Sequence, residues 1–133
     1  MQGASALQGV LEKVDGPVDV FAVWEPVLPT DVLPPGTRTL SRLRDARAWQ
    51  VWDRSHVMSD AMRAGMVAHL SKIPLSAERR GGRVEGVLWD AVALFPPGAR
   101  WEDSLPAPAY LDGDVVDVTG AVAERLQQML HQP

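Results

Sequence analysis

Three acidic residues and one histidine are the side chains whose types and spacing could support chemistry. Glu25 and Asp53 each follow a tryptophan at the end of an apolar run, and Asp31 lies in the proline-rich segment after the first run. If the two runs form neighbouring parallel strands, their carboxyl ends meet at one edge of the sheet, where open α/β sheets place their ligands. Glu25, Asp31, Asp53 and the nearby His56 could then form a hard-cation site or an acid/base pair.

The same four residues have a structural interpretation. Each acid could end a strand in solvent, and His56 could lie in the first turn of the helix that follows. Their spacing matches no defined metal-binding motif. We favour this structural interpretation, and we expect neither a bound metal ion nor another cofactor.

Apolar runs in the sequence predict strands at three places. Residues 18–24 are an apolar run rich in valine, which is typical of a strand covered on both faces. Residues 87–95 form a second strand, which ends at Pro96-Pro97-Gly98. Residues 48–53 are the third candidate. Asp112-Gly113, between two extended segments, predicts a hairpin turn near the end of the chain.

Helical periodicity appears between these strands. It predicts a helix within residues 1–16, a short helix capped by Thr37, a long helix capped by Ser55 and a last helix capped by Thr119. The long helix carries a stripe of methionines, which is more typical of a core than of a binding surface. Strands alternating with helices and followed by an antiparallel pair indicate an α/β fold with a mixed sheet.

Two segments of the chain resemble thioredoxins. VDVFAVW at 18–24 looks like the thioredoxin strand that leads into the redox motif, and 110–130 is similar to the final hairpin and helix of that family. The whole chain also resembles a group of bacterial thioredoxin-like proteins that contain WEPVLPTD and LWD segments. The resemblance implies one thioredoxin-like domain over 1–133, with a mixed sheet of four to five strands flanked by helices and an exposed loop at 76–86.

The resemblance does not extend to the redox centre. In thioredoxins a nucleophilic cysteine follows the tryptophan, and a second cysteine comes after two further residues. Here Glu25 and Leu28 occupy those positions, and the sequence contains no cysteine. The chain is therefore not a thiol–disulfide oxidoreductase. The cis-proline of the family would correspond to Pro106 or Pro108.

These features predict a redox-inactive thioredoxin-like module that binds a protein or peptide. Its binding surface would be a groove formed by Trp24, Glu25, Pro26, Leu28, Pro106 and Pro108. The alternative is a small metal-assisted or acid/base enzyme that uses the carboxylates and the histidine described first. A homodimer formed through the methionine helix or a strand edge is a third interpretation.

The composition argues against two classes of partner. The chain has 17 acidic and 13 basic residues, a net charge of -4 and no dense basic run, which argues against nucleic acid. No apolar stretch approaches the ~20 residues that span a bilayer, so we expect no membrane partner. Residues 1–16 lack the basic and apolar regions of a signal peptide, which favours a cytoplasmic location.

Overall fold

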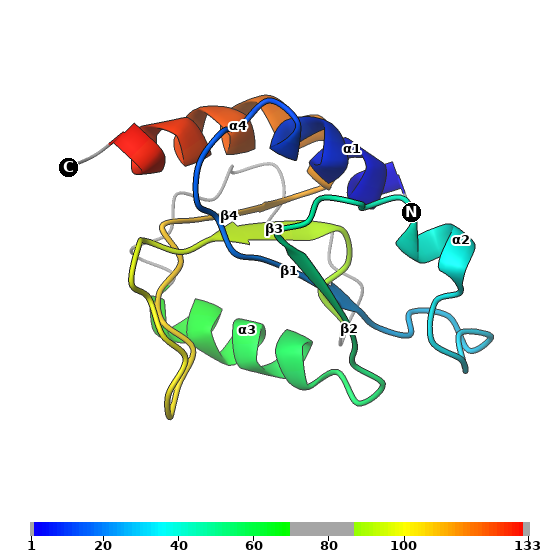
Figure 1. The fold of residues 1–133 in the computed structure, drawn as a ribbon. Coiled ribbons are helices and arrows are strands. Elements are labelled where there is room, and N and C mark those ends of the chain that lie inside the picture. Colours follow the sequence, from blue (N-terminus) through cyan, green and yellow to red (C-terminus); the bar gives the residue numbers. More distant parts are fainter. Residues whose placement is uncertain (1, 70–86, 132–133) are drawn as a thin grey trace.

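The structure, a computed structural model, describes residues 2–69 and 87–131 (Figure 1). Helices and strands alternate through most of the described chain, which confirms the predicted mixed α/β class. In order they are α1 (Gln2–Leu11), β1 (Val20–Trp24), α2 (Thr37–Leu40), β2 (Ala48–Trp52), α3 (Val57–His69), β3 (Ala91–Leu94), β4 (Tyr110–Gly113) and α4 (Val115–His131).

The described strands form two sheets of two strands each. β1 pairs with β2 in parallel, and β3 pairs with β4 antiparallel. The mixed sheet of four to five strands expected from the thioredoxin resemblance is therefore wrong. An apolar run indicates that a segment is extended, but its pairing depends on residues far away in the sequence, so the run does not specify how many neighbours the strand has.

The predicted hairpin at Asp112-Gly113 is also wrong. Gly113 lies in β4 opposite Ala91, and α4 begins at Val115. A Cβ atom at Gly113 would come 2.6 Å from the backbone oxygen of Asp90. The glycine is therefore explained by a close approach of two backbones rather than by a turn.

Several helices and strands begin at residues other than those predicted. The strand expected at 87–95 begins only at Ala91, because Asp90 has a left-handed backbone (φ 52°) that interrupts the extended run. Thr119 lies inside α4, and Thr37 is the first residue of α2 after Gly36, so neither is a cap. The loop predicted at 76–86 lies outside the described residues.

Two layers of helices enclose β3 and β4. In Figure 1, α1 and α4 lie on one side of these strands and α3 lies on the other. The larger core is formed by α1, α4 and one face of β3–β4, with buried side chains at Val10, Val14, Leu94, Tyr110, Val118, Val122 and Leu126. Leu111 points to the opposite face and packs with Met62 of α3 and Phe95. The methionine stripe of α3, as far as its side chains are described, is part of the core as predicted.

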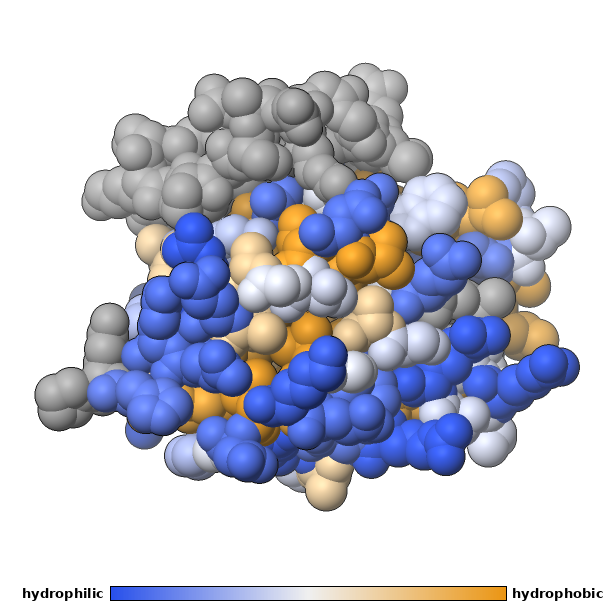
Figure 2. Space-filling view, turned by 90° about the horizontal axis from the view of Figure 1, so that it is seen from above, coloured by the Kyte–Doolittle hydropathy of each residue, from blue (hydrophilic) through white to orange (hydrophobic). Residues whose placement is uncertain are grey.

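The outer surfaces of α1 and α4 are polar. Seen from the side of these helices, the described surface is mainly hydrophilic (Figure 2). In α4 the buried residues recur at three- and four-residue steps from Val115 to Leu126, which leaves the opposite face for charged and amide side chains. Across the described residues, no helix combines the length and the apolar character needed to cross a membrane.

Candidate functional site

The ends of β1 and β2 form the edge at which sequence reasoning placed a site. The two strands are parallel and in register, with Trp24 opposite Trp52, as predicted. The backbone N–H of Asp53 donates to the carbonyl of Trp24 at 2.8 Å and extends the pairing by one step. Glu25 and Asp53 therefore leave the sheet side by side.

Asp53 caps the N-terminus of α3. Its Oδ2 accepts the backbone N–H of Met58 at 2.7 Å, and its Oδ1 accepts that of Ser55 at 3.1 Å. Burial alone would raise the pKa of Asp53, but N–H groups of Met58, Val57 and Ser55 and a side-chain hydrogen bond with Glu25 lower it overall. The predicted cap, Ser55, is thus replaced by a carboxylate two residues earlier.

Glu25 reaches from the end of β1 to the first turn of α3. Its Oε1 accepts the backbone N–H of Ser59 at 3.1 Å, and its Oε2 accepts the Ser59 hydroxyl. Ser59 is only 2% exposed, and its oxygen also accepts the N–H of Leu88 at 2.9 Å. Together Glu25 and Ser59 connect β1, α3 and the segment before β3.

Sequence reasoning missed Ser59. A signal was present, because Ser59 shares the buried side of α3 with Met62, three residues later. A polar residue on an apolar helix face needs a hydrogen-bond partner when it is buried. Nothing in the sequence indicates that its partners are Glu25 and Leu88, which are distant along the chain.

His56 connects the loop after β1 to the start of α3. Its Nε2 lies 2.7 Å from the carbonyl oxygen of Pro26, and because a carbonyl oxygen can only accept, Nε2 must carry the proton. The residue has a positive φ of 58°, which is unfavourable for a side chain with a Cβ atom. Its carbonyl accepts a backbone hydrogen bond from Asp60 at 2.9 Å, so His56 immediately precedes the helix.

Asp31 closes a turn in its own loop. Its Oδ2 accepts the N–H groups of Leu28 at 2.8 Å and Val27 at 3.1 Å, and these two hydrogen bonds, the stronger from Leu28, lower the pKa of Asp31. In the described residues its contacts are with this loop and not with Glu25 or Asp53. Asp31 therefore does not join the other candidates.

The six residues of the predicted groove have different environments. Trp24 is partly buried and donates from Nε1 to Oε1 of Gln50 at 3.1 Å, whereas Leu28 is 56% exposed. Pro106 is half-buried and Pro108 is buried. The one cis peptide bond in the described part of the chain precedes Asp114, so neither of these prolines follows a cis bond. A buried Pro108 offers no contact surface to a ligand.

The arrangement around Glu25 suits a structural junction better than a metal centre. Glu25 and Asp53 do converge at the start of α3 and accept backbone N–H groups there, while His56, just before the helix, bonds to the carbonyl of Pro26. Among residues 2–69 and 87–131, no group of three or more histidines and acids is placed to hold a metal ion. The polar atoms of this cluster are occupied in fixing α3 to the ends of two strands.

A different surface of the same two strands is exposed and apolar. Phe21 and Trp49 are register partners, and their exposed fractions are 67% and 66%. Val51, two residues after Trp49 and therefore on the same face, is 48% exposed. We call Phe21, Val23, Trp49 and Val51 the β1–β2 face. Its contrast with β3–β4, which is covered on both sides, makes it the main candidate binding surface.

No protein-family model, curated protein or solved structure matches this chain.

Proposed function

We propose that this chain is a non-enzymatic interaction module that binds a protein or peptide through the β1–β2 face. The observation that supports this proposal most directly is the exposed pair Phe21–Trp49. Aromatic side chains bury large apolar areas on binding and are common anchors at protein interfaces. With no cysteine in the sequence, the proposed module is redox-inactive.

The chemistry of the face specifies the kind of partner. All four register positions of the β1–β2 face carry apolar side chains, and Trp49 supplies the largest of them. A charged group docked there would lose water without gaining a counter-ion, which is unfavourable. The partner segment should therefore present aliphatic or aromatic side chains, with polar groups only at its margins.

Site-specific photocrosslinking tests the proposal. A benzophenone amino acid is introduced at Phe21 or Trp49 in the full chain, and at Val116 as a matched control. Val116 is an apolar residue of α4 that is 37% exposed. We expect discrete crosslinked adducts from the two strand positions and none from the control, because only the strand positions belong to the extended face.

A binding measurement then tests whether Phe21 and Trp49 contribute to the affinity for the partner. With the crosslinked partner purified, the double variant Phe21→Ser, Trp49→Ser should weaken its affinity by about tenfold or more, since each anchor contributes over ~1 kcal/mol. An unchanged affinity would contradict the proposal. If the adduct has twice the mass of the chain, the partner is a second copy, and light scattering of the wild type and the double variant measures that association.

The enzyme interpretation has one observation in its favour: the carboxyl groups of Glu25 and Asp53 both reach the start of α3, where each accepts a backbone N–H group. Paired carboxyl groups can act as acid and base. A metal-assisted form of this enzyme requires Mg²⁺, Ca²⁺, Mn²⁺ or Zn²⁺ to raise the melting temperature of the wild type more than that of Glu25→Gln, because a ligand of the native state stabilises it. An equal effect of the metal ions on the melting temperatures of the wild type and Glu25→Gln would contradict the metal-assisted form.

A further inference from the structure

A pocket between α1 and the segment around α2 carries an unusual concentration of arginine. Its volume is ≈ 420 Å³, and Arg38, Arg42 and Arg44 line it together with Gln8 and Glu12. This volume lies in the usual range for small-molecule sites, roughly 300–1,000 Å³. The pocket is formed by α1 and residues 38–44, so it does not involve the β1–β2 face.

The positive charge of this pocket is not balanced by neighbouring acids. Glu12 is the one acidic residue in the lining, and it accepts a hydrogen bond from Nε2 of Gln8 at 3.0 Å. The ion pairs within the described residues are Arg47–Asp45 and Arg63–Asp60, and neither involves an arginine of the pocket. A chain with a net charge of -4 therefore gathers positive charge at this place.

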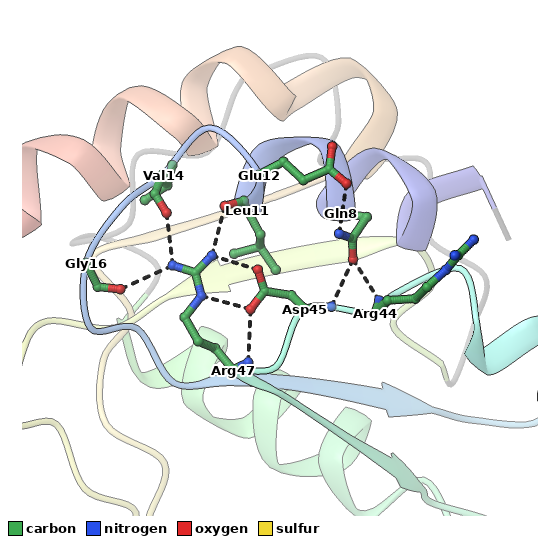
Figure 3. Close-up of polar contacts among 8 residues, drawn as sticks. All are labelled: Gln8, Leu11, Glu12, Val14, Gly16, Arg44, Asp45 and Arg47. Carbon is green, nitrogen blue, oxygen red and sulfur yellow. Dashed lines mark hydrogen bonds and ion pairs between the residues drawn. The ribbon is translucent and has the colours of Figure 1, made fainter.

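Hydrogen bonds hold the arginine segment against α1. Oε1 of Gln8 accepts the backbone N–H groups of Arg44 at 2.7 Å and Asp45 at 3.0 Å (Figure 3). The Nε of Arg44 donates to the carbonyl of Ser41 at 2.8 Å, and the end of its guanidinium extends away from Gln8. A guanidinium fixed at Nε has its two terminal nitrogens free to donate to an anion in a defined geometry.

We propose that this pocket binds a small phosphorylated molecule through Arg38, Arg42 and Arg44. Three guanidinium groups match the several oxygens and the multiple charge of a phosphate ester or a diphosphate, which arginine recognises with paired hydrogen bonds. The remaining lining includes Ser5 and Ser41 and no large apolar side chain. The rest of the ligand is therefore hydrophilic, as in a sugar phosphate, rather than a lipid.

Calorimetric titration of the full chain with pyrophosphate in low-salt buffer tests the assignment. We expect saturable binding that the double variant Arg38→Gln, Arg42→Gln weakens by about tenfold or more, because hydrogen bonds to charged groups are lost. The matched control is Arg54→Gln, Arg100→Gln, which removes the same charge at two exposed arginines elsewhere. An equal loss of pyrophosphate affinity in both double variants would overturn the assignment of this pocket as the binding site.

Two further binding measurements distinguish a specific phosphate site from a general charge effect and from a folding defect. Glu12→Gln removes the acid of the lining and should tighten pyrophosphate binding, a gain that misfolding does not produce. Citrate, a small carboxylate anion of high charge, should bind more weakly than pyrophosphate. Citrate binding that is as tight as pyrophosphate binding, or weaker binding by Glu12→Gln, would overturn the phosphate assignment.

Discussion

Arg47 shows how one side chain can fix several segments. Its two terminal nitrogens donate to the carbonyls of Leu11, Val14 and Gly16 at 2.8 to 3.1 Å, and its guanidinium also pairs with Asp45 (Figure 3). These hydrogen bonds supply donors to the carbonyl groups at and just after the end of α1, and they attach this segment to the start of β2. A lysine has a single nitrogen and could not make the same set.

The partner of this arginine gives a prediction about pH. Hydrogen bonds from the Arg47 side chain and backbone lower the pKa of Asp45 from its ordinary 3.8 to about 2. A carboxylate with a depressed pKa in the folded state contributes its stabilisation fully above 3.8 and loses it as the pH falls through about 2. Asp45→Asn should therefore reduce the free energy of unfolding by about 2 kcal/mol at neutral pH and by progressively less in acid.

Urea unfolding of the wild type and Asp45→Asn over this pH range measures the difference. Asp19→Asn is the control, because Asp19 is exposed and is a carboxylate of the same type. A difference between Asp45→Asn and the wild type that stays constant as the pH falls would show that the charge of Asp45 is not what stabilises the junction.

At the residue scale, the sequence identified where Glu25 and Asp53 would be but not what they would bind. Each follows the last residue of a parallel strand, and strand ends can be located from composition. Their partners, Ser59 and the N–H of Met58, become neighbours only once α3 packs against the strands. Asp31 instead accepts the N–H groups of Val27 and Leu28 within its own turn.

At the scale of the element, the hydrogen bonds at the start of α3 show which of two candidate residues caps the helix. Asp53 accepts N–H groups at the helix start, whereas Ser55 donates its own N–H to that carboxylate. We expect Asp53→Ala to lower the free energy of unfolding by ~1–2 kcal/mol, the effect of losing an N-cap. Ser55→Ala should change it by less than ~0.5 kcal/mol. Urea unfolding of both variants measures this, and the opposite ranking would return the cap to Ser55.

Two glycines near the end of the chain differ in how much space surrounds them. At Gly113 a Cβ atom would lie 2.6 Å from the oxygen of Asp90, which belongs to the backbone and cannot rotate away, while Gly120 has no such neighbour within 4 Å. Gly113→Ala should therefore destabilise the fold by about 1–3 kcal/mol. Gly120→Ala, inside α4, should stabilise it by up to ~1 kcal/mol. Thermal unfolding of both variants tests the pair, and a neutral Gly113→Ala would contradict the strand assignment.

The same glycine explains an error at the element scale. Asp-Gly is a strong turn signal because glycine accepts a positive φ, but glycine is also required where two backbones approach closely. The sequence does not distinguish these two requirements, since both select for the lack of a side chain. Only the pairing of Gly113 with Ala91 shows which of them applies.

At the scale of the whole molecule, the two sheets are covered to different extents. The β3–β4 pair has a core on each face, whereas Phe21 and Trp49 leave one face of β1–β2 exposed. Composition predicted β1, β2 and β3 as apolar segments, and the parallel neighbours were predicted correctly. The coverage of each face could not be predicted, because an apolar strand in a core and one at an interface have the same composition.

The exposed face gives a prediction about stability and solubility. Phe21→Thr, Trp49→Thr keeps residues that favour strands and removes aromatic area that is already in water, so the free energy of unfolding should change by less than ~1 kcal/mol. Solubility should increase, because an exposed apolar patch promotes association. Leu111→Ala, at a residue 2% exposed, should in contrast cost ~2–5 kcal/mol. Urea unfolding and a precipitation assay test this, and similar losses for both variants would mean that the face is part of the core.

The packing of α1 on α4 has a consequence for the order in which the chain can fold. The apolar residues of α1 and the turn after it, Val10 and Val14, are covered by Val118, Val122 and Leu126, which are about a hundred positions later. During synthesis these valines leave the ribosome long before their partners exist. Until α4 emerges, the first helix must remain solvated, be held by a chaperone or associate transiently with other segments.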